Sequence, residues 1–206
     1  MKKILTLFTL LIITSFSVFS QKDTLILLNG NTYALEKYTF NQEDSSITAS
    51  IVLKKVKTKE KQFDINDVFG IKKQNGTLEI FYKPATNEYT PQQMQDFIKG
   101  EQLATKYYKP TIAIITEYLL STAITLELST MGYMVYSPVG VLIPTITLSL
   151  IPPSKNKFDK KFPKLKDKKY IKQGYIAGGK NKKTINLIES GLAGMLTGLV
   201  TVIILM

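Results

Sequence analysis

The sequence contains no cysteine, histidine, tryptophan or arginine. Missing histidine and cysteine remove the commonest general base, the commonest thiol nucleophile and the usual zinc ligands. A Ser-His-Asp triad is excluded, and lysine, the remaining cation, cannot form the bidentate phosphate clamp of arginine. The chain also has no Walker loop and no dinucleotide-binding fingerprint. We therefore expect no enzyme activity, no catalytic residue, no cofactor and no metal site.

Lysine is abundant, and the formal net charge is +11 at pH 7. Such a balance can indicate nucleic-acid binding, but residues 1–20 have the layout of a signal peptide. Two lysines precede an apolar run, and Val18 and Ser20 stand at −3 and −1 before Gln21. We expect the chain from Gln21 onward to lie outside the cytoplasm, whether residues 1–20 are cleaved or remain as an anchor. No nucleic-acid partner is expected.

Residues 21–84 alternate short β-rich runs with turn residues, which predicts a small extracytoplasmic β domain. Asn-Gly pairs at 29–30 and 75–76 predict hairpins with type I′ turns, in which both central residues have positive φ. A third hairpin is expected from residues 46–56 and 58–63. The result is about six antiparallel strands, either barrel-like or a strongly twisted sheet. The lysines of the third hairpin indicate a solvated edge strand.

Residues 85–110 are predicted to form an amphipathic linking helix. Thr90 to Gln93 form a capping box with proline at the first helical position, and apolar residues then recur at helical spacing. We expect this helix to pack on the β domain. The alternative is a helix at the bilayer interface, with Tyr107 and Tyr108 as aromatic anchors.

Two motifs resemble those of a family of uncharacterised exported bacterial membrane proteins. The first reads D-T-aliphatic-x-L-x-N-G and is matched by Asp23, Thr24, Leu25, Leu27, Asn29 and Gly30. The second reads G-x-x-x-A-x-x-Y-Y and is matched by Gly100, Ala104, Tyr107 and Tyr108. The resemblance implies a signal peptide, a β domain and apolar spans with a lysine-rich linker, and it assigns no activity.

Three apolar stretches follow. Two of them lie in an apolar membrane region at 111–152, and the third is at the C-terminus. Residues 185–206 carry one acid near their start, and residues 131–151 carry no charge but contain two prolines. Residues 111–129 contain Glu117 and Glu127, and a charge at the centre of a span costs about 2.5–3.5 kcal/mol. We therefore predict spans at 131–151 and 185–206, with 111–129 at the outer interface.

The loop at 153–184 holds twelve lysines. Short lysine-rich loops stay cytoplasmic, and each lysine near anionic lipid contributes about 1 kcal/mol. We expect two spans joined by this loop, on the face opposite the β domain. The alternative topology has three spans and places the loop outside the cytoplasm. It is favoured by a gapless self-similarity between residues 97–112 and 170–185, whose two copies would enter the membrane from the same side.

Small residues form a stripe on the C-terminal helix. Ser190, Gly194 and Gly198 recur every fourth residue, a pattern that lets another helix approach closely. We expect this stripe to pack either on residues 131–151 or on a second copy of the chain, which would give a homo-oligomer.

Glu117, Glu127 and Glu189 are the acids of the apolar stretches. A carboxylate within a membrane is a functional hypothesis by default. Glu127 and Glu189 are expected near the membrane surfaces, so Glu117 is the candidate intramembrane carboxylate.

These expectations describe an α+β membrane protein with a small antiparallel β domain followed by an α-helical membrane region. We expect it in the bacterial cell envelope, integral to the inner membrane, with the N-terminal domain extracytoplasmic. Its expected function is that of a membrane-anchored envelope protein whose β domain binds or scaffolds a partner. Expected partners are the lipid bilayer and an envelope protein. The alternative is a small transport or channel accessory, or an oligomerising membrane subunit.

Overall fold

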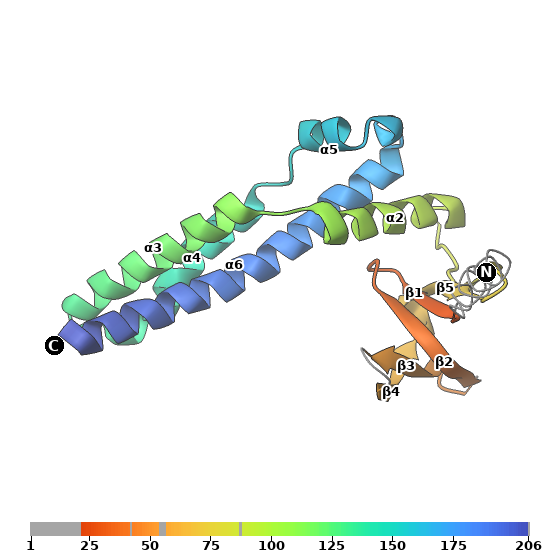
Figure 1. Ribbon diagram of the computed structural model, residues 1–206, viewed down its shortest axis with the longest axis horizontal. Helices are drawn as coiled ribbons and strands as arrows, with labels where there is room; N and C mark the ends of the chain where they lie inside the picture. Colours follow the sequence, from red (N-terminus) through yellow and green to blue (C-terminus); the bar gives the residue numbers. More distant parts are fainter. Residues whose placement is uncertain (1–21, 42, 54–56, 87, 206) are drawn as a thin grey trace, which may run out of the picture. The chain divides into compact units, whose positions relative to one another are not determined.

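The computed structural model describes residues 22–41, 43–53, 57–86 and 88–205, so the predicted signal peptide lies outside the described residues. The chain divides into two compact units, Met1–Lys83 and Pro84–Met206. The first unit is a β-sheet and the second is built from helices (Figure 1). The predicted α+β organisation is therefore confirmed.

The β unit is one antiparallel sheet of six strands with the order β4-β3-β2-β1-β5-β6. Its strands are β1 (Thr24–Leu27), β2 (Thr32–Asn41), β3 (Ser46–Leu53), β4 (Lys57–Asp64), β5 (Val68–Lys72) and β6 (Leu78–Ile80). The sequence did not distinguish a barrel from a twisted sheet. The observed strand order is that of an open sheet, with edges at β4 and β6. The lysine-rich strand β4 is an exposed edge strand, as predicted.

Apolar residues at alternate positions form the core of this unit. In β3, Ile47, Ala49 and Ile51 are buried, as the period of two requires for one face of a strand. A single cluster joins side chains from β1 to β5: Leu25, Leu27, Leu35, Ile47, Ala49, Ile51, Phe63, Val68 and Ile71. One face of the sheet therefore carries the hydrophobic stabilisation of the unit.

The loop between β1 and β2 differs from the predicted type I′ turn. The N–H of Gly30 donates to the carbonyl of Leu27 at 3.1 Å, and the N–H of Leu27 donates to Asn31 at 2.9 Å. Gly30 has φ 77°, whereas Ser45 is the one non-glycine residue with positive φ in the described part of the chain. This is a three-residue hairpin loop ending in a left-handed glycine. Asn29 stays at negative φ because its Oδ1 accepts the N–H of Asn31 at 3.1 Å.

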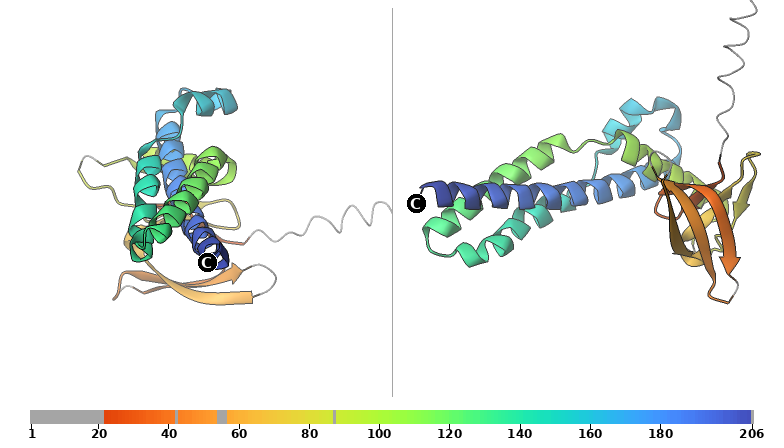
Figure 2. Two further views of the ribbon diagram at one scale, coloured as in Figure 1. Left: turned by 90° about the vertical axis from the view of Figure 1, so that its left-hand side faces the viewer. Right: turned by 60° about the horizontal axis from the view of Figure 1, so that its bottom comes forward.

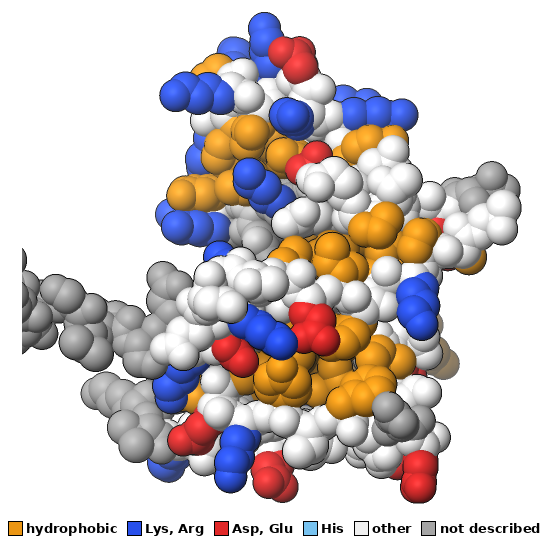
Figure 3. All heavy atoms as spheres, turned by 90° about the vertical axis from the view of Figure 1, so that its right-hand side faces the viewer, with side chains coloured by type: hydrophobic (Ala, Val, Ile, Leu, Met, Phe, Trp, Pro, Cys, Tyr) orange, Lys and Arg blue, Asp and Glu red, His pale blue; other side chains and the backbone are white. Residues whose placement is uncertain are grey.

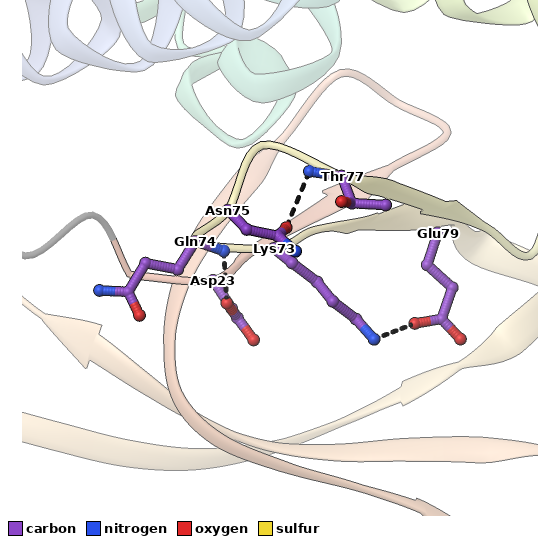
Figure 4. A network of polar contacts seen from close by, with 6 residues as sticks. All are labelled: Asp23, Lys73, Gln74, Asn75, Thr77 and Glu79. Carbon is purple, nitrogen blue, oxygen red and sulfur yellow. Dashed lines mark hydrogen bonds and ion pairs between the residues drawn. The ribbon is translucent and has the colours of Figure 1, made fainter.

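The loop between β5 and β6 has the same geometry and is held by side-chain hydrogen bonds and an ion pair (Figure 4). Asn75 Oδ1 accepts the backbone N–H two residues on at 3.0 Å, and Asp23 Oδ1 accepts the N–H of Gln74 at 2.8 Å. Lys73 Nζ lies 3.0 Å from Glu79, whose hydrogen bond and negative charge raise the pKa of Lys73. Asp23, the first residue of the motif described above, thus fixes a neighbouring turn.

The helical unit has five helices among the described residues, joined in part by short 3-10 turns. They are α2 (Pro91–Tyr107), α3 (Thr111–Thr130), α4 (Ser137–Leu150), α5 (Lys155–Lys161) and α6 (Lys169–Leu205), with η2 (Met134–Tyr136) and η3 (Pro163–Leu165) between them. The predicted loop at 153–184 is therefore largely helical. It contains α5 and the first turns of α6, a helix that we expected to begin at residue 185.

Helices α2 and α3 run parallel to α6, and α4 returns in the opposite direction beside α3 and α6 (Figures 1 and 2). Residue numbers rise together along the contact: Gly174 packs on Phe97 and Gly198 packs on Thr125. The two self-similar segments, residues 97–112 and 170–185, consequently lie side by side and point in the same direction. The weak repeat in the sequence therefore has a physical counterpart.

Helix α2 begins as predicted. Thr90 Oγ1 accepts the N–H of Gln93, and the Gln93 side chain accepts the N–H of Thr90. Its packing partner differs from the prediction, because the buried face containing Ile98 and Ala104 lies on α6 rather than on the sheet. Glycines at the α2–α6 contact bring the two helices so close together that a larger side chain would clash with the backbone of the other helix.

Within the described residues, α3 and α6 are long and apolar enough to cross a membrane. The predicted span at 185–206 lies in α6, but the predicted span at 131–151 does not qualify. Its helix, α4, has 14 residues with Pro144 inside it and is about 21 Å long at about 1.5 Å per residue. A third crossing is possible only if α4 and α5 together form one span. In that case the span would include η2 before α4 and a bend of 57° between α4 and α5.

Candidate functional site

The helical unit carries large apolar side chains on its outer surface, and the buried face of α3 is polar. On α3 the buried residues recur every fourth position and are all polar: Glu117, Ser121, Thr125 and Ser129. Outside, Ile112 is 80% exposed, Val135 86% and Ile203 69%. A helix in water shows the opposite pattern, with its apolar stripe facing the core. In α3 the usual distribution of polar and apolar side chains is therefore inverted.

Glu117 lies within this interior and has no exposed surface. Its Oε1 accepts hydrogen bonds from Ser121 Oγ at 3.0 Å and from Thr145 Oγ1 at 2.7 Å. Gly191 of α6 leaves room for the carboxyl, because a Cβ there would come within 2.9 Å of Oε1. Three helices thus enclose one carboxyl group. The second oxygen, Oε2, is buried and has no hydrogen-bond partner.

Many hydroxyl side chains elsewhere in the bundle donate to the backbone of the preceding turn, although the buried hydroxyls of Ser129 and Ser137 have no hydrogen-bond partner. Thr122 donates to the carbonyl of Tyr118 at 2.8 Å, and the exposed Thr147 donates to that of Ile143 at 2.8 Å. Such bonds to the preceding turn let serine and threonine sit in an apolar environment without an unpaired donor. The many threonines of these helices are therefore compatible with membrane burial.

The predicted packing stripe lies on the face of α6 that contacts α3. Ser190 Oγ donates to the carbonyl of Ile114 at 2.8 Å. A Cβ on Gly194 would come within 2.5 Å of the Tyr118 carbonyl oxygen, and Gly198 packs on Thr125 in the same way. The partner is thus α3 and not residues 131–151, because the side chains of α3 at this contact are small or polar. A second copy could reach the stripe only by displacing α3.

Toward its N-terminal end, α6 makes an equally close contact with α2. Here Gly178 faces Glu101, whose Cα would lie 2.9 Å from an added Cβ. Glu101 is 6% exposed, and its Oε2 has no hydrogen-bond partner. Burial without a compensating cation raises the pKa of Glu101 to about 7. This carboxyl was not among the predicted site residues, since on α2 it resembles any polar residue of an amphipathic helix.

An aromatic cluster and two lysines close the end of the bundle where α3 begins. The rings of Phe158, Phe162 and Tyr175 pack together with centroids 4.9 to 5.9 Å apart. Lys161 Nζ donates to the carbonyl of Tyr107 at 3.1 Å. Lys183 Nζ donates to the carbonyls of Leu148 and Ile151, which end α4. The lysine-rich segment is thus bound to the bundle by specific contacts.

Tyr107 and Tyr108, the aromatic anchors of the alternative interfacial helix, also lie at this end. The ring of Tyr107 packs edge-on against Phe162, and that of Tyr108 packs edge-on against Tyr175. Burial, with a smaller contribution from Tyr175, raises the pKa of Tyr108. Both tyrosines therefore belong to the aromatic cluster.

The structure separates the three acids of the apolar stretches. Glu117 is fully buried, whereas Glu127 and Glu189 are exposed on the outer surface of the bundle. Thr145 and Lys183 join the polar contacts but were not among the predicted residues. Thr145 gave no signal, because its partner Glu117 is 28 positions away, and Lys183 was one lysine among twelve.

Comparisons with protein-family models, with curated proteins and with solved structures gave no match. The resemblance to exported bacterial membrane proteins therefore stays a prediction. The described residues contain no group of three or more acidic side chains that could hold a metal ion. The interior site is accordingly a carboxyl group held among hydroxyl groups and glycines.

Replacing Gly194 with leucine should separate α3 from α6. Its side chain would meet a backbone oxygen, which cannot move without distorting α3, so we expect a loss of about 3 kcal/mol in the free energy of unfolding. Ala193→Leu is the matched control, because residue 193 is exposed on the same helix. Thermal unfolding in detergent measures both. Equal melting temperatures for the two variants would contradict the observed packing.

Glu101 makes the α2–α6 contact sensitive to pH. The pKa is about 7 in the folded protein against 4.5 for the free side chain, so the folded state binds more protons than the unfolded state. The contribution of Glu101 to stability is therefore full below pH 4.5 and falls by up to about 3 kcal/mol as the pH rises from there through 7. Glu101→Gln should flatten this dependence in thermal unfolding across the same range. A slope unchanged by the substitution would assign it to another group.

Proposed function

We propose that this chain is an integral membrane protein of the bacterial cell envelope, anchored by its helical unit and presenting its β unit as a binding or scaffolding module. The observation that carries the proposal is the inverted distribution of side chains in the helical unit. Exposed side chains on α3, α4 and α6 are predominantly apolar, whereas the buried positions of α3 are all polar and the face of α6 that meets α3 carries Ser190, Gly194 and Gly198. Lipid tails satisfy such a surface and water does not.

The dimensions of the helices support the same conclusion. Helix α3 has 20 residues and is about 30 Å long, the thickness of the hydrocarbon core of a bilayer. The apolar part of α6 from residue 185 onward is about as long. The connection between α3 and α4 is uncharged, and Tyr133, Met134 and Val135 are exposed there. An uncharged apolar tip can enter or cross the bilayer at low cost.

All lysines of the helical unit lie toward one end of the bundle. Residues 110–154 and 184–206 contain none. Because α3 and α6 are parallel, the lysines of α2, of α5 and of the first turns of α6 gather where α3 begins. They are visible in the upper part of Figure 3, where α5 and the start of α6 lie. This supports a membrane boundary at that end of the bundle.

The parallel arrangement also bears on topology. Our sequence prediction put the lysine-rich segment on the membrane face opposite the β domain, but α3 and α4 together return the chain to the end from which it entered. Helix α2 is charged and is not among the candidate spans. The β unit and the lysine-rich segment therefore share one face. The layout of residues 1–20 places that face outside the cytoplasm, whereas the positive-inside rule alone would place it inside.

The β unit supports a binding role through its open edges. Strand β6 has three residues and ends at Ile80, which is 43% exposed, and Phe40 near the end of β2 is 47% exposed. An edge strand with unpaired backbone groups is a template for an added strand from a partner. We therefore propose a binding or scaffolding role for this unit.

Cysteine labelling tests the topology directly, because the natural chain has no cysteine. Single substitutions Lys83→Cys, Lys166→Cys and Val135→Cys place a unique thiol after the β unit, in the lysine-rich segment and at the α3–α4 connection. An impermeant maleimide applied to intact spheroplasts should label the first two and leave the third unlabelled until the membrane is opened. Labelling of residue 83 without residue 166 would contradict a shared face.

A second candidate function, a transport or channel accessory, is favoured by the buried Oε2 of Glu117. An unpaired carboxyl oxygen enclosed by three helices is a natural place for a proton or a small cation. In liposomes holding a pH-sensitive dye, this candidate predicts that the wild-type protein accelerates proton entry and that Glu117→Gln abolishes the effect. Thr145→Ser, which keeps the hydroxyl donor, is the control. Proton entry equal to that of protein-free liposomes would remove the candidate.

A further inference from the structure

A cavity of about 680 Å³ lies at the end of the bundle where the lysines gather. Its walls come from the connection between α2 and α3, from the end of α4, from the start of α5 and from α6. Two kinds of side chain meet in it: the cations of Lys109, Lys157 and Lys183, and the apolar groups of Ile112, Leu148 and Ile151. The cavity is therefore amphipathic.

The charged side chains that line the cavity are all positive. Four lysines line it, the fourth being Lys161, and no aspartate or glutamate is among the lining residues. Lys183 is only 4% exposed, and its ammonium group contacts two backbone carbonyls and no carboxylate. A buried cation without an anion is costly. The negative end of the α4 dipole offsets part of that cost, and an anionic ligand in the cavity would offset more.

Two of the lysines are available to a ligand. Lys161 donates to the carbonyl of Tyr107, and Lys183 is committed to the end of α4. For Lys109 and Lys157, the described residues provide no hydrogen bond or ion pair. These two side chains line the cavity from separate segments, one from the connection between α2 and α3 and one from α5. An anion between them would meet two cations from separate segments.

The apolar wall of the cavity continues into the outer surface of the bundle. Ile112 and Ile151 line the cavity and are also 80% and 59% exposed. A ligand with an anionic head and long apolar chains can therefore place its head among the lysines and its chains along the helices. Tyr107 and Tyr108 lie at the same level, as aromatic residues do at the boundary of a bilayer.

The geometry points to a binding site for one anionic glycerophospholipid, with its phosphate group between Lys109 and Lys157 and its acyl chains against Ile112 and Ile151. This inference rests on the proposed membrane location and adds a specific lipid to it. The ligand joins α3, α4 and α5, so it also holds the lysine-rich segment against the bundle.

The test uses the full-length protein, released from mixed micelles with equal amounts of phosphatidylglycerol and phosphatidylcholine and examined by native mass spectrometry. The wild-type protein should retain one phosphatidylglycerol in preference to phosphatidylcholine. The double variant Lys109→Gln/Lys157→Gln should lose this preference by about thirtyfold, from about 1 kcal/mol for each lysine removed. The double variant Lys164→Gln/Lys166→Gln removes the same charge outside the cavity and should retain the lipid.

Three results would overturn the inference. The wild-type protein could retain both lipids equally, or the control double variant could lose as much lipid as the cavity variant, which would indicate unspecific attraction. Displacement of the lipid by soluble glycerol phosphate would assign the site to a free phosphate. Resistance of the vesicle-bound protein to carbonate is measured in parallel. Extraction of the wild-type protein would contradict the proposed function, whereas stable insertion without lipid preference contradicts the lipid site alone.

Discussion

The close contact of α6 with α2 and α3 is the constraint on which the helical unit depends. Small residues line the contact from Gly174 to Gly198, and several of them face backbone atoms of the neighbouring helix. Any larger side chain would push the helices apart. Because the contact extends over most of α6, it fixes the direction of α3, and the direction of α3 in turn determines where α4 returns and where the lysines gather.

The polar interior follows from that close packing. Glycines on α6 leave space for the side chains of α3, and Glu117 fills part of that space while accepting hydrogen bonds from hydroxyl groups on α3 and α4. In a lipid environment these groups have no better partners, so they hold the three helices in register. The exterior is formed mainly by isoleucine, leucine and valine, with Glu127 and Glu189 exposed among them. Packing and membrane compatibility are therefore two consequences of one arrangement of small, polar and apolar residues.

Local signals in the sequence predicted the local structure well. Asn-Gly pairs located two hairpins, and the Thr90 capping box located the start of α2. The turn type was wrong because the asparagine side chains bond to backbone N–H groups, a competition that the Asn-Gly pair alone does not reveal. The apolar run located the C-terminal part of the long helix, but the start of that helix at Lys169 was not predicted, since lysines usually indicate a loop.

Properties that depend on distant residues were not predictable in the same way. Helix α3 was ranked below α4 as a span because Glu117 and Glu127 were both counted as charges within it. The partners of Glu117, Ser121 and Thr145, appear only in the folded bundle. The packing stripe was found from its spacing, whereas its partner helix was not, because spacing describes one helix at a time. The weak repeat was the one sequence feature that pointed to parallel helices, and the excess of lysine outweighed it.

The parallel direction of α3 and α6 is the central claim, and distances between spin labels in liposomes test it most directly. Labels on cysteines introduced at Ile112 and Ile188 lie on exposed positions near the contact of Ile114 with Ser190, and a third label at Leu205 marks the far end of α6. The account predicts that residue 112 is much closer to residue 188 than to residue 205. A shorter distance from residue 112 to residue 205 would mean antiparallel helices and would contradict it.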